Sequence, residues 1–188
     1  MIRQRNSLSL RYADDMKHLL ALAVMIAAWP ACAGVIEGRV IEVPDGGTVT
    51  VLSNEGASIH RVRLAGIDAP GRERSYGGNS RESLRRIAVG KTVRVETRAI
   101  DAKGLLVGTV MIVRSPNECG NQPCAPLLDP GLTQLKFGWA VIDKANLPRQ
   151  DEEAQKNYLD AEAQARSNRL GVWREPHFQV RAEVVRFR

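Results

Sequence analysis

Alternating apolar and polar residues mark the chain from residue 35 onwards, with a period of two that is typical of half-buried strands. The first three such stretches are 35–43, 48–52 and 58–66. In the third stretch, Val62 and Leu64 share one face, while Arg61 and Arg63 share the other. Turn-forming residues rich in glycine, aspartate and asparagine separate the stretches. The pattern predicts a meander of three antiparallel strands joined by tight turns.

A helical period follows the meander. Leu84 and Ile87 belong to an apolar stripe, Asn79 or Ser80 can cap the start of the helix, and Gly90 stands where a glycine commonly follows a helix end. We therefore expect a helix of about ten residues after the third strand.

Two further strand patterns and two helical ones complete the chain. The strands cover 91–97 and 105–113, and the helices cover 132–137 and a longer segment that starts at Asp151. Five strands with a helix between the third and the fourth give the order of an OB-fold barrel. The predicted fold class is therefore α+β and rich in strand: a five-stranded barrel with about three helices.

The amino-terminal segment has the composition of a secretion signal. An apolar run from Leu19 to Trp29 follows several basic residues, and Ala31-Cys32-Ala33 supplies the small-x-small pattern of a cleavage site. The run is short for a membrane span, and an uncleaved anchor is the alternative. We expect a signal peptide over 1–33, with Met16 as a second candidate start, and export to the periplasm or out of the cell.

The exported chain is expected to hold one domain over 34–174 and a tail over 175–188. The full sequence carries a formal charge of +6, and loss of the four basic and two acidic residues of the first 33 leaves +4. This balance permits a polyanionic partner, and no membrane association is expected after cleavage. Aromatic residues make up only 5% of the chain, which argues against a stacking platform for single strands.

Export changes how the cysteines are interpreted. Without Cys32, the chain keeps Cys119 and Cys124 in the loop Cys-Gly-Asn-Gln-Pro-Cys, which suits a small disulfide in an oxidising compartment. Zinc would need two more ligands nearby, and His60 and His177 are remote in sequence. A redox-active pair is an alternative, although the usual motif has two intervening residues. We expect a structural disulfide.

The stretch from Arg61 to Gly78 carries the candidate chemistry. Arg63 lies on the predicted strand, and Asp68 lies in the Asp-Ala-Pro-Gly turn that ends it. A cation and a carboxylate at the end of a strand suit a phosphate or metal site. The simpler alternatives are a solvated charge at Arg63 and a turn cap at Asp68.

Several motifs in this order resemble the staphylococcal nuclease-like (thermonuclease) family. They are Pro44-Asp45-Gly46, Val62-Arg63-Leu64-Ala65-Gly66-Ile67-Asp68-Ala69-Pro70, Tyr76-Gly77, Asp101-Ala102-Lys103-Gly104, Ala161-Glu162-Ala163-Gln164-Ala165-Arg166 and Leu170-Gly171-Val172-Trp173. The resemblance covers about residues 35–174. It implies a five-stranded OB barrel with three helices and, for active members, calcium-dependent hydrolysis of phosphodiester bonds in DNA and RNA.

The resemblance also implies five side-chain roles, of which this sequence keeps two. Arg63 matches the first phosphate-clamping arginine, and Asp68 matches one calcium ligand. Gly47 stands where the family has a second aspartate ligand, Gly71 where it has the glutamate general base, and Leu105 where it has the second arginine. Glycine at positions 47 and 71 is also what tight turns favour on backbone grounds.

These substitutions predict impaired catalysis. Calcium takes six to eight oxygen ligands, so a single aspartate is a poor site, and the transition-state charge lacks its clamp. Glu73 and Lys103 are nearby but poor substitutes, since Glu73 is displaced by two residues and Lys103 cannot form a bidentate fork. We expect an exported binding module for nucleic acid or a protein, without a resident cofactor. The alternative is an active calcium-dependent nuclease with a rearranged site.

Overall fold

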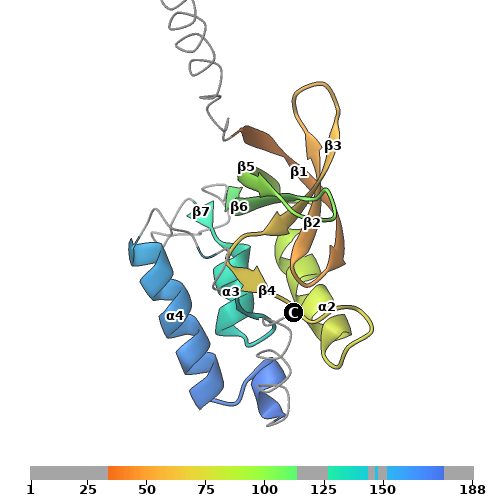
Figure 1. Cartoon of the computed structure of the whole chain (residues 1–188). Coiled ribbons are helices and arrows are strands. Elements are labelled where there is room, and N and C mark those ends of the chain that lie inside the picture. The colour runs from red at the N-terminus through yellow and green to blue at the C-terminus, as the bar shows by residue number, and fades with distance from the viewer. Residues whose placement is uncertain (1–33, 114–126, 144–146, 148–151, 176–188) are drawn as a thin grey trace, which may run out of the picture. The chain divides into compact units, whose positions relative to one another are not determined.

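The computed structural model describes residues 34–113, 127–143, 147 and 152–175, all of which belong to the unit Ala33–Arg188 (Figure 1). The strands are β1 Val35–Asp45, β2 Thr48–Ser53, β3 Ile59–Leu64, β4 Ile67–Asp68, β5 Thr92–Ile100, β6 Leu106–Val113, β7 Leu127–Leu128 and β8 Val141–Ile142. The helices are α2 Gly77–Ala88, α3 Pro130–Lys136, α4 Glu152–Ser167 and the 3-10 helix η2 Gly171–Arg174.

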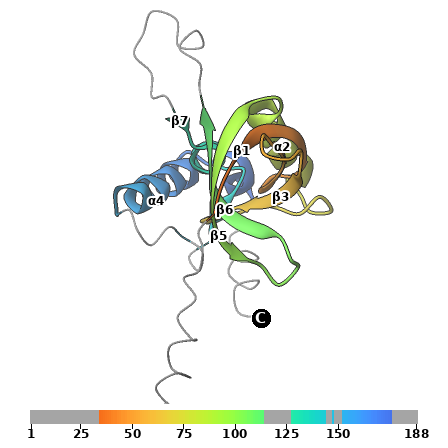
Figure 2. The same ribbon diagram turned by 90° about the horizontal axis from the view of Figure 1, so that it is seen from above.

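Five of the strands form a closed barrel. The hydrogen-bonded order is β3-β2-β1-β5-β6, and a parallel pairing of β3 with β6 closes the ring (Figure 2). The two-residue strand β7 extends the sheet from β6, in a region that the sequence pattern leaves as loop. The predicted five-stranded OB-fold barrel with three α-helices is confirmed.

Inward-facing β-branched side chains fill the barrel. Val49 and Val51 of β2, Val62 of β3 and Val93 and Val95 of β5 have no exposed surface. Leu84 of α2 and Leu135 of α3 are equally buried and join the same core. Because fully burying such a side chain is worth roughly 1.5–3 kcal/mol, this cluster fixes both helices against the barrel.

Helix α2 begins earlier than the sequence pattern predicts. Its cap is Tyr76, in the left-handed region at φ 64°, with no side-chain hydrogen bond to the helix. Neither Asn79 nor Ser80 caps it. Ser80 is instead fully buried, and its hydroxyl donates to the carbonyl of Trp139 at 2.7 Å. The predicted glycine after the helix end is confirmed at Gly90, with φ 78°.

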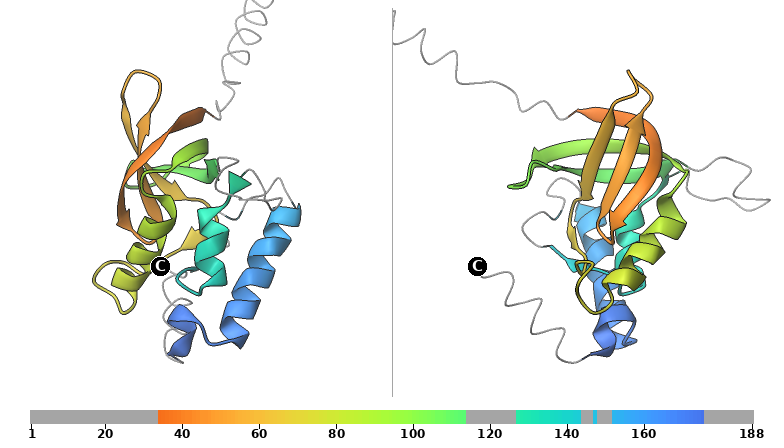
Figure 3. Two further views of the ribbon diagram at one scale, coloured as in Figure 1. Left: turned by 180° about the vertical axis from the view of Figure 1, so that it is seen from behind. Right: turned by 90° about the vertical axis from the view of Figure 1, so that its right-hand side faces the viewer.

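Helices α3 and α4 lie side by side beneath the barrel (Figure 3). Asp129 caps α3 by accepting from the Leu132 amide at 3.0 Å, and its second oxygen accepts from the Tyr158 hydroxyl at 2.7 Å. One half-buried carboxylate therefore ties the start of α3 to the middle of α4.

Several expectations lie outside the described residues. They are the signal peptide over 1–33, the disulfide between Cys119 and Cys124, the helix start at Asp151 and the tail from residue 176. Within the described ranges, no helix combines the length and the apolar character that crossing a membrane requires.

Candidate functional site

Arg63 occupies a rigid position near the end of β3. It pairs with Thr48 of β2 on one side and with Val107 of β6 on the other. Its side chain is 34% exposed, and its Nη2 lies 3.6 Å from Oδ1 of Asp68 and 3.5 Å from Oδ2 of Asp143. The guanidinium is thus shared by two carboxylates, one that the sequence predicts and one that it does not.

A second, small sheet brings the two carboxylates to Arg63. Asp68 ends β4 and pairs with Val141 of β8, while the Asp143 amide donates to the Gly66 carbonyl at 3.0 Å. The Asp68 side chain is 49% exposed and that of Asp143 only 18%. Asp143 is remote from Arg63 in sequence, and its only signal is its place directly after the apolar run Ala140-Val141-Ile142.

The turn between β1 and β2 is held from three directions. The Gly47 amide donates to Oδ1 of Asp45 at 2.9 Å, and the Gly47 carbonyl accepts from the Leu64 amide at 2.8 Å. Nε2 of the buried Gln134 donates to the Gly46 carbonyl at 3.0 Å and to the Ser80 carbonyl at 2.9 Å. The turn therefore keeps a fixed place beside the strand that carries Arg63.

The two substituted glycines are not required by the backbone. Neither Gly47 nor Gly71 has a positive φ. A Cβ at Gly47 would lie 3.4 Å from Cβ of Ala69, an ordinary contact beside Asp68, and a Cβ at Gly71 would meet nothing within 4 Å. The backbone therefore permits residues other than glycine at both positions, and both have room for a side chain.

Leu105 precedes the strand that closes the barrel. Oδ1 of Asp101 accepts from the Leu105 amide at 2.9 Å and from the Lys103 amide at 2.8 Å. The hydrogen bond from Leu105 is the largest cause that lowers the pKa of Asp101, and the positive charge of Arg63 lowers it further. The parallel pairing of β3 with β6 thus brings Leu105 and Asp101 towards Arg63.

Negative charge outweighs positive charge around Arg63. The carboxylates of Asp68 and Asp143 lie within 3.6 Å of its guanidinium, and Asp101 is close enough for the charge of Arg63 to lower its pKa. These carboxylates outnumber the one guanidinium that they face. Because phosphate is an anion, this neighbourhood repels it more than an arginine on a strand would suggest.

The residues at this site do not fit the calcium ion that the family implies. Among the described residues, no group of three or more histidine, cysteine, aspartate or glutamate side chains could hold a metal ion. Asp68 and Asp143 share the guanidinium of Arg63 as their counter-charge. A hard cation that takes six or more oxygens would have to displace that arginine.

Comparison with known proteins decides the family. The family model described as staphylococcal nuclease homologue matches residues 61–175, more than half of the chain. The protein belongs to the staphylococcal nuclease family. The match includes Arg63 and Asp68 and begins after the turn that carries Gly47.

Similar proteins include one described as protein ParB from Escherichia coli, 30% identical over 158 residues. The matched part covers 84% of this chain and 82% of that relative. The micrococcal nuclease of Shigella flexneri is 30% identical over 169 residues, 87% of this chain and 88% of the relative. An uncharacterized endonuclease of Escherichia coli O157:H7 is 36% identical over 95 residues. The matched part spans 50% of this chain and 61% of that endonuclease.

Proposed function

We propose that this protein is an exported nuclease-family module with impaired catalysis that binds nucleic acid. The observation that carries the impaired catalysis is the position of the Arg63 guanidinium between the carboxylates of Asp68 and Asp143. An arginine that clamps a phosphate must offer its N–H donors to phosphate oxygens. Here two carboxylates compete for the same cation.

The three substituted positions support the same conclusion. Gly47 and Gly71 have no side chain with which to hold a metal ion or to accept a proton from water, and Leu105 is apolar. Losing one preorganised group at such a site typically costs ~10²–10³ in rate, although such losses are not additive. Hydrolysis by Arg63 and Asp68 alone would be slow.

Nucleic acid is the ligand class that the remaining features favour. The formal charge is +6 for the whole sequence and +4 without residues 1–33, and relatives carry the names nuclease and endonuclease. A positively charged surface attracts polyanions, and such binding weakens steeply with salt. A protein partner is the other ligand class, and a wild-type chain that fails to bind nucleic acid at low salt would favour it.

The second candidate is an active nuclease with a rearranged site. Asp143 favours it, because it places a second carboxylate opposite Asp68 at the same arginine. In this version Asp143 would replace one of the missing acidic side chains, with calcium as the cofactor. The geometry supports this version less well, because Arg63 holds both carboxylates.

A cleavage assay separates the two candidates. The full chain is incubated at high concentration with single- and double-stranded DNA and with RNA, in calcium and in chelator. The Asp68→Ala variant, purified in parallel, measures contaminating nuclease. We expect wild type and variant to be equally inactive. Chelator-sensitive cleavage that Asp68→Ala abolishes would overturn impaired catalysis and support the active nuclease.

Export and the disulfide have tests of their own. Mass spectrometry of the protein recovered outside the cytoplasm should show loss of residues 1–33. Alkylation without reductant should leave Cys119 and Cys124 unmodified, and alkylation after reduction should modify both. A retained amino terminus would point to the uncleaved anchor, and free thiols would exclude the disulfide.

A further inference from the structure

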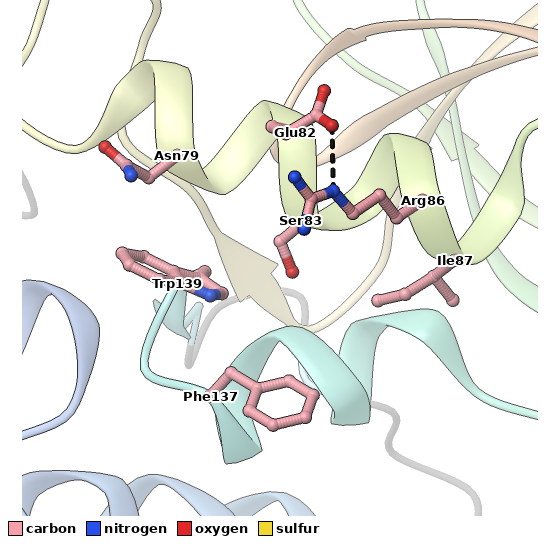
Figure 4. Close-up of a pocket in the computed structure, with 7 residues that line it drawn as sticks. All are labelled: Asn79, Glu82, Ser83, Arg86, Ile87, Phe137 and Trp139. Carbon is pink, nitrogen blue, oxygen red and sulfur yellow. Dashed lines mark hydrogen bonds and ion pairs between the residues drawn. The ribbon is translucent and has the colours of Figure 1, made fainter.

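A groove separate from Arg63 lies between α2 and the segment that follows α3 (Figure 4). Its volume is about 360 Å³. The lining from α2 consists of Asn79, Glu82, Ser83, Arg86 and Ile87, and the rings of Phe137 and Trp139 line the opposite wall. Two aromatic rings and a row of polar side chains therefore face one another across a shallow pocket.

Of the two rings in the aromatic wall, Trp139 is held in place by the surrounding structure. The Trp139 amide donates to the Gln134 carbonyl at 2.9 Å, and its carbonyl accepts from the Ser80 hydroxyl at 2.7 Å. Its ring lies 6.3 Å from that of Tyr76, at 42°. Phe137, in contrast, is 54% exposed. Rings that are held in place before a ligand arrives lose little entropy when they bind it.

Helix α2 brings positive charge to this groove. It carries Arg81, Arg85 and Arg86 against a single acid, Glu82, for a net charge of +2. Glu82 accepts hydrogen bonds from Arg85 at 2.7 Å and from Arg86 at 2.8 Å, and these bonds lower its pKa to about 2. The Arg86 side chain is still 75% exposed. Helix α2 therefore carries an excess of positive charge beside the groove, while within the lining Glu82 balances the charge of Arg86.

We propose that this groove takes one base of a single-stranded nucleic acid. The base stacks against Trp139 and Phe137, Asn79 and Ser83 hydrogen-bond its polar edge, and Arg86 contacts a neighbouring phosphate. Aromatic rings beside cations are the usual device for binding single strands, since every base has a face that can stack. The low aromatic content of the chain excludes an extended platform, not a groove for one base. The inference rests on nucleic-acid binding as the proposed function.

Fluorescence anisotropy of a labelled 12-residue oligothymidylate, titrated with the full chain, tests the groove. Phe137→Ala should weaken binding by about fivefold or more, because it removes one stacking surface. Arg86→Gln should weaken binding and lower the salt slope by about one. Both side chains are well exposed, so the melting temperature should change little.

Matched variants elsewhere serve as controls. Leu159→Ala removes an apolar side chain on α4 that is 49% exposed, and Arg94→Gln removes a cation on β5 that is also 49% exposed. Neither should change affinity as much as its counterpart in the groove. If each control weakens binding as much as its counterpart, the groove is excluded as the binding site. Binding would then depend only on net charge, or would respond to any surface substitution.

Two further outcomes separate this inference from the proposed function. Cross-linking with an oligonucleotide that carries 5-iodouracil should modify the peptide that contains Trp139. Cross-links that map only to the Arg63 region would overturn the groove and leave nucleic-acid binding intact. A wild-type chain that binds no oligonucleotide, DNA or RNA at low salt would overturn both.

Discussion

Adjacent glycines in the β1–β2 turn have different physical roles. A Cβ at Gly46 would collide with the side chain of Ser80, which is itself fully buried. A Cβ at Gly47 would make only an ordinary contact with Ala69. Gly46 is therefore required by packing, whereas the turn has room for a side chain at Gly47.

Alanine substitution should separate the two glycines. Gly46→Ala should lower the free energy of unfolding by about 2 kcal/mol or more, because the core around Ser80 cannot move aside cheaply. Gly47→Ala should change it by less than about 1 kcal/mol. Urea denaturation of both variants measures the difference. Equal losses would show that the turn is strained at both positions.

Restoring the missing side chains should restore chemistry if the scaffold is otherwise intact. Gly47→Asp places a carboxylate beside Asp68, Gly71→Glu has open space, and Leu105→Arg returns the second cation. The triple variant should cleave DNA in calcium at a rate at least about tenfold above the Asp68→Ala background. The triple variant with Asp68→Ala added is the control. No recovery would mean that these positions do not converge on one site.

Among the elements, α3 connects the barrel to the rest of the domain. Gln134 reaches Gly46 and Ser80 from its buried face, and Asp129 at its start holds Tyr158 of α4. Burial is the largest influence on the Asp129 carboxyl and raises its pKa, against the hydrogen bonds from Tyr158 and Leu132. The start of α3 therefore depends on a carboxyl group whose burial favours the protonated form.

This balance gives a pH dependence with a definite sign. A carboxyl whose pKa is higher in the folded state stabilises the fold at low pH, and this contribution is lost as pH rises through the folded-state value. Asp129→Asn removes the charge and keeps one acceptor oxygen for the Leu132 amide, while its amide nitrogen can donate to the Tyr158 hydroxyl oxygen. Its unfolding free energy relative to wild type should therefore rise between pH 4 and pH 7, as measured by urea denaturation. A fall over that range would mean that the hydrogen bonds outweigh burial.

For the whole molecule, the sequence predicts the barrel well and its site only in part. The strands are visible because alternation is local, as at Val62 and Leu64. Asp143 is not visible, because only the pairing of β4 with β8 brings it to Arg63. Ser80 matches a helix cap in sequence, yet the buried contact with Trp139 takes its hydroxyl. The contacts of Asp143 and Ser80 join residues that are far apart in the chain, and a local sequence pattern does not predict such contacts.

The distribution of charge also differs between the Arg63 site and α2. The Arg63 site has an excess of carboxylates, while α2 carries an excess of arginines next to two exposed or half-buried rings. A protein that has lost phosphodiester hydrolysis and retains nucleic-acid binding would use the second surface more than the first. The family resemblance alone would direct attention to Arg63.

The most direct test of this account is a calorimetric titration of the full chain with calcium. Wild type should show no saturable binding at millimolar calcium, because Asp68 and Asp143 both pair with Arg63 and Gly47 has no side chain to offer as a ligand. Gly47→Asp should gain a binding isotherm. A single wild-type site that saturates and that Asp68→Ala removes would contradict the account.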